Sequence, residues 1–296
     1  MNLVYVNNKA YSIRKDPQYY GIEQQWLNHL DLKNLGIISI DDIEGLDTLT
    51  DLESLDLRDN LITKISGLDH LQNLSRLQIG NKIEKIEGLE HLNALKFLTI
   101  HGNLTKIENL EHLQNLLILD LSHNQISEIS NLISLKGLTY LSLSSNNISN
   151  IRGLDDIRLL GRLNLSFNKI KKIEGLESLS SLFWLKLSNN RITQIQGLDS
   201  LKKLSILNLD NNKITEINGL DSLSELRILS LYRNRITRIS GLNNLSKLEK
   251  LNLSENLITD LSDFEFPSNY LYDLRVHGNP LPKKQLREFR KYEFHH

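Results

Sequence analysis

The chain has 296 residues, and its 35 lysines and arginines nearly balance its 36 aspartates and glutamates, so the formal net charge is −1. This balance gives no overall field that would favour nucleic acid or an anionic membrane surface as a partner. The sequence contains no cysteine, which excludes a disulfide framework, a thiolate zinc site and a thiol nucleophile.

Residues 1–29 are predicted to form an N-terminal cap made of a hairpin and an amphipathic helix. Apolar and polar residues alternate from residue 3 to residue 13 around Asn7 and Asn8, a pattern typical of a hairpin. Asp16 followed by Pro17 is typical of a helix N-terminus. The apolar positions at helical spacing are Tyr19, Ile22, Trp26 and Leu30. Such a helix would cover an open apolar end, although Trp26 and the nearby tyrosines could instead form a separate binding site.

The N-terminus has no basic region followed by an apolar core and a small-residue cleavage site. No run of about 18 apolar residues occurs in the chain. We therefore expect a soluble protein of the cytoplasm, or of the nucleus in a eukaryotic cell, without a membrane partner.

Residues 30–263 are predicted to contain one imperfect and ten regular copies of a repeat. The pattern L-x-x-L-x-x-L-x-x-L-x-L-x-x-N-x-I-x-x-I-x-G begins at Leu46 and recurs about every 22 residues. In its strand, Leu55 and Leu57 share one face and Asp56 lies on the other, because side chains alternate at period 2. No copy can cover its own apolar side, so the copies must stack. This predicts an α/β chain folded as a curved right-handed leucine-rich-repeat solenoid, capped at both ends, with a parallel concave β-sheet and with turns and short 3₁₀ segments on the convex side.

Two polar columns are predicted to have structural roles. An asparagine amide both donates and accepts, and can satisfy backbone groups between neighbouring copies where the chain leaves the strand. These asparagines are Asn60, Asn81, Asn103, Asn124, Asn146, Asn168, Asn190, Asn212, Asn234, Asn256 and Asn279. The glycine column is replaced by asparagine at Asn109 and Asn131, which indicates a left-handed backbone position.

The motif L-x-L-x-x-N-x-I-x-x-I-x-G-L resembles the repeats of the leucine-rich regulatory subunit of protein phosphatase type 1 and those of bacterial internalins. The resemblance extends over roughly residues 30–282. It implies a protein-binding platform that uses its concave face, and it does not identify the partner.

Two adjacent copies, which begin at Leu68 and Leu89, are each one residue short where the chain leaves the strand. This shortening is interpreted either as tolerated variation of a loop or as the shaping of a contact surface. Residues 264–296 are predicted to form a terminal half-repeat and a C-terminal cap, with a basic helix from Lys283 to Tyr292. His295 and His296 are either native or the remnant of an expression tag.

The residue before each inner L-x-L is predicted to carry the binding function, because this column faces solvent and is unusually apolar from Phe97 to Ile228. The candidate anchors are Phe97, Ile118, Tyr140, Trp184, Ile206 and Ile228, with Arg162 as a polar discriminator and Tyr232 in a neighbouring column. Aromatic residues of this kind are enriched in binding hot spots. The alternative is that these side chains only stack on one another along the sheet.

Chemical sites are less strongly indicated. His70, His91 and His112 occupy the same position in three successive copies, where they could bind a metal or could be the product of repeat duplication. Phosphate-binding, metalloprotease and hydrolase motifs are missing from the sequence. We therefore expect no enzyme activity, no cofactor and no metal.

The expected function is a non-catalytic protein-interaction module that binds a folded protein on its concave face. The first resemblance implies a regulatory subunit whose partner is a phosphatase catalytic subunit. The alternatives are an extracellular adhesion or recognition protein of internalin type and a purely structural scaffold. No nucleic-acid partner is expected, and the oligomeric state is left open because the apolar column could pair with itself.

Overall fold

The computed structural model describes residues 3–20, 23–262, 264–265 and 267–289. The chain divides into two compact units, Met1–Ser142 and Leu143–His296, each of which is described by itself. None of the helices within the described ranges is long and apolar enough to span a membrane.

The first unit begins with a two-stranded hairpin. Strand β1 (Leu3–Val6) pairs antiparallel with β2 (Lys9–Ser12), and Leu3 lies opposite Ser12. Asn7 and Asn8 form the connecting turn with φ angles of 50° and 61°. Two successive positive φ angles match the right-handed twist of a tight hairpin, and asparagine tolerates them. The hairpin predicted around these two asparagines is confirmed.

The prediction of a helix after Asp16 is wrong. The backbone instead forms strands β3 (Arg14–Tyr20) and β4 (Glu23–Asp31), which pair antiparallel. The end of β4 is also parallel to β5 (Ser54–Arg58), with Leu30 opposite Leu55, so pairing with the first regular repeat outweighs the local helical signal. Pro17 lies in β3 at the edge of the sheet, the position in a sheet where proline is usually tolerated. The side chains of residues 16–26, including the predicted Trp26 site, lie outside the described residues.

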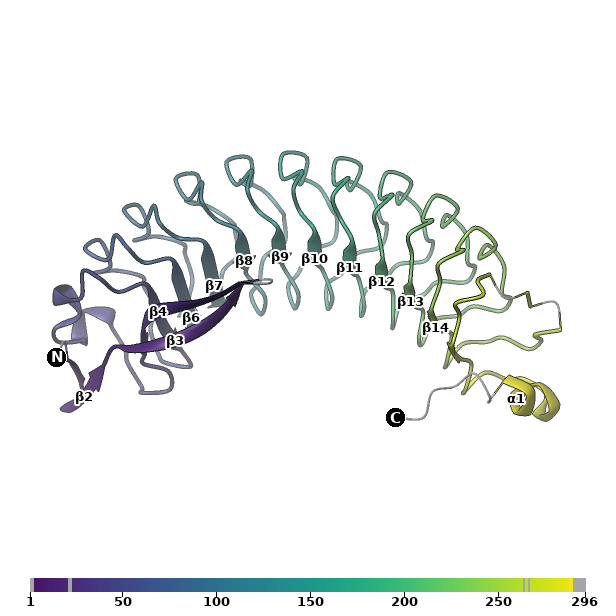
Figure 1. Ribbon diagram of the computed structural model, residues 1–296, viewed down its shortest axis with the longest axis horizontal. Helices are drawn as coiled ribbons and strands as arrows, with labels where there is room; N and C mark the ends of the chain where they lie inside the picture. The colour runs from purple at the N-terminus through teal and green to yellow at the C-terminus, as the bar shows by residue number, and fades with distance from the viewer. Residues whose placement is uncertain (1–2, 21–22, 263, 266, 290–296) are drawn as a thin grey trace. The chain divides into compact units, whose positions relative to one another are not determined.

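Parallel strands, one from each repeat, make up the rest of both units. In the first unit, β5 is followed by β6 (Arg76–Ile83), β7 (Phe97–Gly102), β8 (Ile118–Asp120) and β9 (Tyr140–Ser142). In the second unit the strands are β10 (Arg162–Asn164), β11 (Trp184–Lys186), β12 (Ile206–Asn208), β13 (Ile228–Ser230), β14 (Lys250–Asn252) and β15 (Asp273–Arg275). Figure 1 shows β10–β14 side by side, each joined to the next by a return segment on the other side of the turn.

The leucine and isoleucine columns form the core of each turn. Leu185 and Leu187 of one strand are fully buried, as are the return-segment residues Leu198, Leu201 and Leu204. The return segment turns through i→i+3 hydrogen bonds, such as the 2.9 to 3.0 Å bonds from Leu71 to Leu68 and from Leu204 to Leu201. Two of these segments are regular enough to be 3₁₀ helices, η1 (Ile40–Asp42) and η2 (Leu46–Thr48). The predicted leucine-rich-repeat solenoid with a parallel sheet is therefore confirmed.

The asparagine column connects successive turns. The Asn168 side-chain oxygen accepts from the Ile148 N–H at 2.9 Å, while its Nδ2 donates to the carbonyls of Leu143 and Leu165 at 2.8 and 3.1 Å. Asn190 repeats these contacts one turn later. Each buried amide thus satisfies groups of its own turn and of the preceding one, as predicted.

Asn103 was wrongly placed in this column. Its backbone N–H donates to the Ile83 carbonyl at 2.8 Å, the role that Lys169 has in a regular turn, and its side chain is half-exposed. The cause is the missing residue in each short copy. A regular strand ends in a residue with positive φ, such as His123 at 56°, whereas within the described backbone β6 and β7 continue past this point without one. The side chain of Asn81 lies outside the described residues.

The glycine column has the predicted left-handed backbone, for example φ of 66° at Gly175. A Cβ atom there would lie 2.3 Å from the Ile151 carbonyl oxygen, so a side chain would also collide with the preceding turn. Asn109 and Asn131, with φ of 57° and 58°, occupy the same position and donate from Nδ2 to the equivalent carbonyls at 2.7 Å. An amide can therefore replace glycine by forming a hydrogen bond.

The C-terminal helix α1 (Lys283–Phe289) confirms the described part of the predicted basic helix; residues 290–296, including His295 and His296, lie outside the described ranges. The Phe289 ring packs edge-to-face on Phe264 with centroids 6.0 Å apart. Gln285 accepts from the Leu261 N–H at 3.0 Å and donates to Asp260. The hydrogen bond from Gln285, together with those from the Ser262 hydroxyl and N–H, lowers the pKa of Asp260 to about 2.

Replacing Asn168 with alanine is expected to lower the free energy of unfolding by at least about 2 kcal/mol, because it leaves buried backbone groups of two turns without partners. Asn103→Ala is the matched control and is expected to change it by less than about 0.5 kcal/mol. Urea titration measures both values. An equal loss in the two variants would contradict the assignment of Asn103 to a different column.

Gly175→Ala is expected to destabilise the chain by about 2 kcal/mol or more, because it adds both backbone strain and a clash with Ile151. Gly175→Asn should retain more stability than the alanine variant, since its amide can donate to the same carbonyl. Thermal unfolding of the two variants compares them directly. Greater stability of Gly175→Ala would show that the hydrogen bond has no compensating role.

Candidate functional site

The candidate site is the open face of the sheet, which we define as the side opposite the buried leucines. In the first unit, Phe97, Ile118 and Tyr140 are direct partners on consecutive strands of this face. Phe97 is only 7% exposed, and the other two side chains are half-buried. The guanidinium group of Arg76 lies 4.8 Å from the centre of the Phe97 ring. The sequence placed these residues in one row correctly, whereas their role in binding stays a prediction.

The second unit carries the other predicted anchors on its own open face. Arg162, Trp184, Ile206 and Ile228 are partners on four consecutive strands, and Lys250 continues the row. Arg162 is exposed and the three apolar side chains are half-buried. The Lys186 ammonium group lies 4.8 Å from the centre of the Trp184 ring, a cation–π contact. These side chains both stack on their neighbours and keep part of their apolar surface in water.

Side chains alternate between the two faces of a strand, so Tyr232, which comes just after β13, lies on the same face as Ile228 and Ser230. Its N–H donates to the Asp210 carboxylate at 2.9 Å, and the Ser230 hydroxyl donates to the same oxygen at 2.6 Å. Arg233 covers the Tyr232 ring at 5.0 Å. Tyr232 is therefore held in place beside the apolar row.

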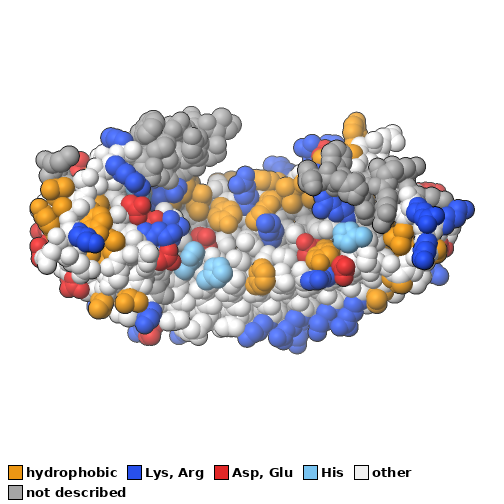
Figure 2. Space-filling view, turned by 90° about the horizontal axis from the view of Figure 1, so that it is seen from below, with side chains coloured by type: hydrophobic (Ala, Val, Ile, Leu, Met, Phe, Trp, Pro, Cys, Tyr) orange, Lys and Arg blue, Asp and Glu red, His pale blue; other side chains and the backbone are white. Residues whose placement is uncertain are grey.

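Figure 2 shows hydrophobic side chains gathered on this side of the molecule with Lys and Arg side chains among them.

Phe183 is an exposed aromatic residue of the second unit that is not among the anchors predicted from the sequence. It precedes Trp184 and is 39% exposed. Its ring occupies the space next to Gly161, where a Cβ atom would lie only 2.7 Å away, and the Arg162 guanidinium lies 5.4 Å from the ring centre. Gly161 and Phe183 occupy equivalent positions of adjacent repeats. A glycine followed one repeat later by a large aromatic residue at the same position is the sequence pattern from which this contact could have been predicted.

A polar cluster lies on the first unit's open face beside the apolar row. The Ser122 hydroxyl is 3.1 Å from the His101 Nε2, and Asp120 Oδ2 is 3.7 Å from the same nitrogen. Burial disfavours the Asp120 carboxylate, but hydrogen bonds with His101 and Ser122 outweigh this effect, so that the pKa of Asp120 lies below its ordinary value. A serine-hydrolase triad needs the acid on the opposite ring nitrogen from the serine. The cluster does not have that geometry.

The histidine column has backbone partners. Nε2 of His70 lies 2.9 Å from the Leu46 carbonyl oxygen, and Nε2 of His112 lies 2.8 Å from that of Leu89. Each ring thus joins its return segment to the preceding one. Within the described ranges, no group of three or more histidine, aspartate or glutamate side chains is arranged to hold a metal ion.

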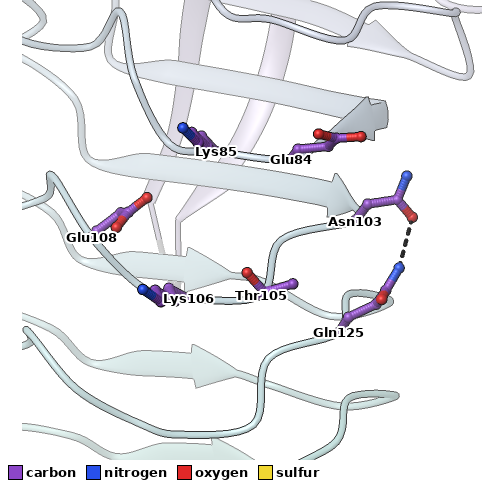
Figure 3. Close-up of a pocket in the computed structure, with 7 residues that line it drawn as sticks. All are labelled: Glu84, Lys85, Asn103, Thr105, Lys106, Glu108 and Gln125. Carbon is purple, nitrogen blue, oxygen red and sulfur yellow. Dashed lines mark hydrogen bonds between the residues drawn. The ribbon is translucent and has the colours of Figure 1, made fainter.

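A polar recess lies beside the two short copies of the first unit. It has a volume of about 580 Å³ and is lined by Glu84, Lys85, Asn103, Thr105, Lys106, Glu108 and Gln125. Figure 3 shows the lining side chains on three consecutive return segments, with Gln125 donating to Asn103 at 3.1 Å. The residues lost from the short copies therefore coincide with a change in surface shape.

Comparisons with known proteins agree with this architecture. A family model described as leucine-rich repeats in two copies matches residues 114–156, 180–222 and 224–266. A crystal structure of an internalin from Listeria monocytogenes is similar with a TM-score of 0.78 and 31% identity, covering 90% of this chain and 78% of that one. A second internalin from that organism, internalin C2, has a TM-score of 0.55 and 32% identity over 61% of this chain and 80% of its own. No curated protein matches the chain.

A further similar structure is the leucine-rich-repeat ectodomain of a receptor kinase from Arabidopsis thaliana, in complex with Casparian strip integrity factor 2. Its TM-score is 0.60 and its identity 25%, over 79% of this chain and 32% of the receptor chain. The resemblance to internalin repeats is confirmed by these matches. The resemblance to the phosphatase regulatory subunit stays a prediction.

The lowered pKa of Asp120 predicts a pH dependence of stability. A depressed pKa contributes stability at pH values above the unfolded-state value of about 3.9, and this contribution is lost as the pH falls through the folded-state pKa. As the pH is lowered below about 4, the free energy of unfolding should therefore decrease less steeply for Asp120→Asn than for the wild type. Asp156→Asn, at an exposed position, is the control and should follow the wild type. Identical slopes for wild type and Asp120→Asn would contradict this account.

Proposed function

The chain belongs to the leucine-rich-repeat family, and we propose that it is a non-catalytic protein-interaction module that binds a folded protein on the open face of its sheet. The observation that carries this proposal is the row Trp184, Ile206 and Ile228 in the second unit. These three side chains are direct neighbours on adjacent strands and remain half-exposed.

The row is not needed to close the repeat core. The inner leucines of the same strands, Leu185, Leu207 and Leu229, lie on the opposite face of the sheet and are almost completely buried there. A solvent-facing column with only a structural role would favour polar residues. An apolar row that includes a tryptophan is the composition of a binding hot spot, since aromatic side chains bury a large area on association.

The surroundings of the row favour a protein partner. Arg162 at one end and Lys250 at the other are charged, and Lys186, Asn208 and Ser230 form a polar column beside the row. An apolar centre with a polar margin is the usual organisation of a protein interface. In the first unit, Ile118 and Tyr140 are half-exposed in the same way, and we propose the same role for them, whereas Phe97, which the sequence placed on the solvent-facing side, is buried.

Two versions of the partner follow from the family. An internalin-type recognition protein would bind a protein on another cell, and the similarity of 31% over 90% of this chain to an internalin supports this version. A phosphatase regulatory subunit would bind a phosphatase catalytic subunit, and it rests on the repeat motif alone. The two versions differ in a simple observable, because only the second predicts phosphatase activity in the captured complex.

The proposal is tested with wild-type chain and Trp184→Glu as baits for protein capture, followed by measurement of the affinity for the captured partner. Burial of a carboxylate in place of the indole is expected to weaken binding at least about 30-fold, equivalent to the loss of a hot spot of about 2 kcal/mol. Circular dichroism melting verifies that the variant is folded.

Leu159→Glu is the matched control, because Leu159 is an apolar residue of the same unit that lies on a return segment and is 59% exposed. It should bind the partner as the wild type does. Equal binding by Trp184→Glu and the wild type would refute the proposed site. Loss of binding in Leu159→Glu alone would place the interface on the return segments.

A further inference from the structure

The second unit carries a row of cations on a different surface, the edge where the chain leaves each strand. We define the cationic row as Lys169, Arg191, Lys213 and Arg235, each of which follows a buried asparagine in one of four consecutive turns. All four residues are exposed. In Figure 2 a row of Lys and Arg side chains extends along the lower edge of the molecule.

The backbone fixes the spacing of this row. The N–H groups of Lys169, Arg191, Lys213 and Arg235 donate to the isoleucine carbonyls of the preceding turns, Ile148, Ile170, Ile192 and Ile214, each at 2.8 Å. The bases of the four side chains therefore repeat once per turn, at about the 4.8 Å separation of neighbouring strands. The row is therefore a regularly spaced set of positively charged side chains on a fixed backbone.

The four cations have no ion pair and no side-chain hydrogen bond to any other residue in the described part of the chain. Like charges on adjacent strands repel one another, so the row opposes folding stability. The equivalent positions in the first unit include Leu61, Lys82, Asn103 and Gln125, with one cation among them. The repeat framework therefore does not require cations here, and the row is a property of these four turns.

Uncharged hydrogen-bonding residues flank the two middle cations of the row on both sides, whereas Phe167 and Lys171 flank Lys169, and Arg233 comes two residues before Arg235. Asn189 and Asn211 come two residues before a row cation, and Thr193, Thr215 and Thr237 come two residues after one. The threonines are exposed and the two asparagines are half-exposed. Hydroxyl and amide groups beside Arg191 and Lys213 suit a ligand that carries hydroxyl groups next to its anionic groups.

We infer that the cationic row binds an unbranched acidic polysaccharide with one carboxylate or sulfate per sugar. A β-linked uronate chain carries one carboxylate per sugar, and the long side chains of lysine and arginine can reach carboxylates at several positions along the row. Lysine and arginine form strong charge-assisted hydrogen bonds with such groups. A single-stranded nucleic acid would need aromatic platforms between the cations, and Phe167 at one end is the aromatic residue that adjoins the row. A surface that binds an anionic bilayer would be expected to have continuous apolar residues beside its cations. Here asparagines and threonines interrupt such a margin.

The test measures binding of a fluorescently labelled oligomannuronate hexamer to the full chain by fluorescence anisotropy at several salt concentrations. The wild type should bind at low salt and lose affinity as salt rises, because bound counterions are released. Lys169→Gln/Arg191→Gln/Lys213→Gln/Arg235→Gln should weaken binding at least about tenfold and flatten the salt dependence.

The matched control is Arg158→Gln/Lys202→Gln/Lys203→Gln/Lys284→Gln, which removes the same charge from exposed positions of the same unit. It should bind the hexamer with the wild-type affinity. The inference is overturned if the wild type does not bind at low salt, or if both quadruple variants lose affinity equally. Tighter, row-dependent binding of a thymidine dodecamer or of phosphatidylserine vesicles would also overturn it, in favour of nucleic acid or a lipid surface. Because the row lies outside the open face, Trp184→Glu should leave hexamer binding unchanged.

Discussion

The hydrogen bonds of the buried asparagines are the interaction on which the rest of the structure depends. Each amide fixes the point where the chain leaves a strand, and at the same time joins that turn to the preceding one through carbonyl and N–H groups of both. Stacked leucines provide the apolar free energy, but they do not by themselves determine the register. The directional amide bonds and the backbone pairing of adjacent strands do so together, and the outward-facing columns take their spacing from both.

This arrangement separates stability from recognition. The leucine, isoleucine, asparagine and glycine columns are occupied by the groups that the turn requires, whereas the outward positions of the strand and of its exit edge are free to vary. The second unit uses this freedom twice, with the half-exposed row Trp184, Ile206 and Ile228 on the open face and with the cations Lys169 to Arg235 on the exit edge. Two surfaces of different chemistry can thus be carried by one set of turns without disturbing the core.

The regular part of the fold could be predicted because each copy of the repeat has the same pattern of leucine, isoleucine, asparagine and glycine. The hairpin at Asn7 and Asn8 was predictable from its turn residues, and the left-handed positions from glycine and asparagine. The segment after Asp16 was not, because its helical spacing is overridden by pairing of β4 with β5. Asn103 was assigned to the wrong column because its copy is one residue short, which moves Asn103 to the next position of the repeat. Only the backbone hydrogen bonds show this shift. For the open face, the row of anchors was predictable, while the contact of Phe183 with Gly161 depends on packing between turns.

The central claim is that the open face binds a partner while the inner columns only maintain the fold. The most direct measurement is a saturation mutagenesis scan of residues 143–262, scored separately for folded protein and for binding to the captured partner. Variants at the inner leucines and asparagines should lose folding and binding together. Variants at Trp184, Ile206 and Ile228 should remain folded and lose binding. If the folded, non-binding variants instead lie on the return segments and variants of the open face still bind, the open face is not the interface.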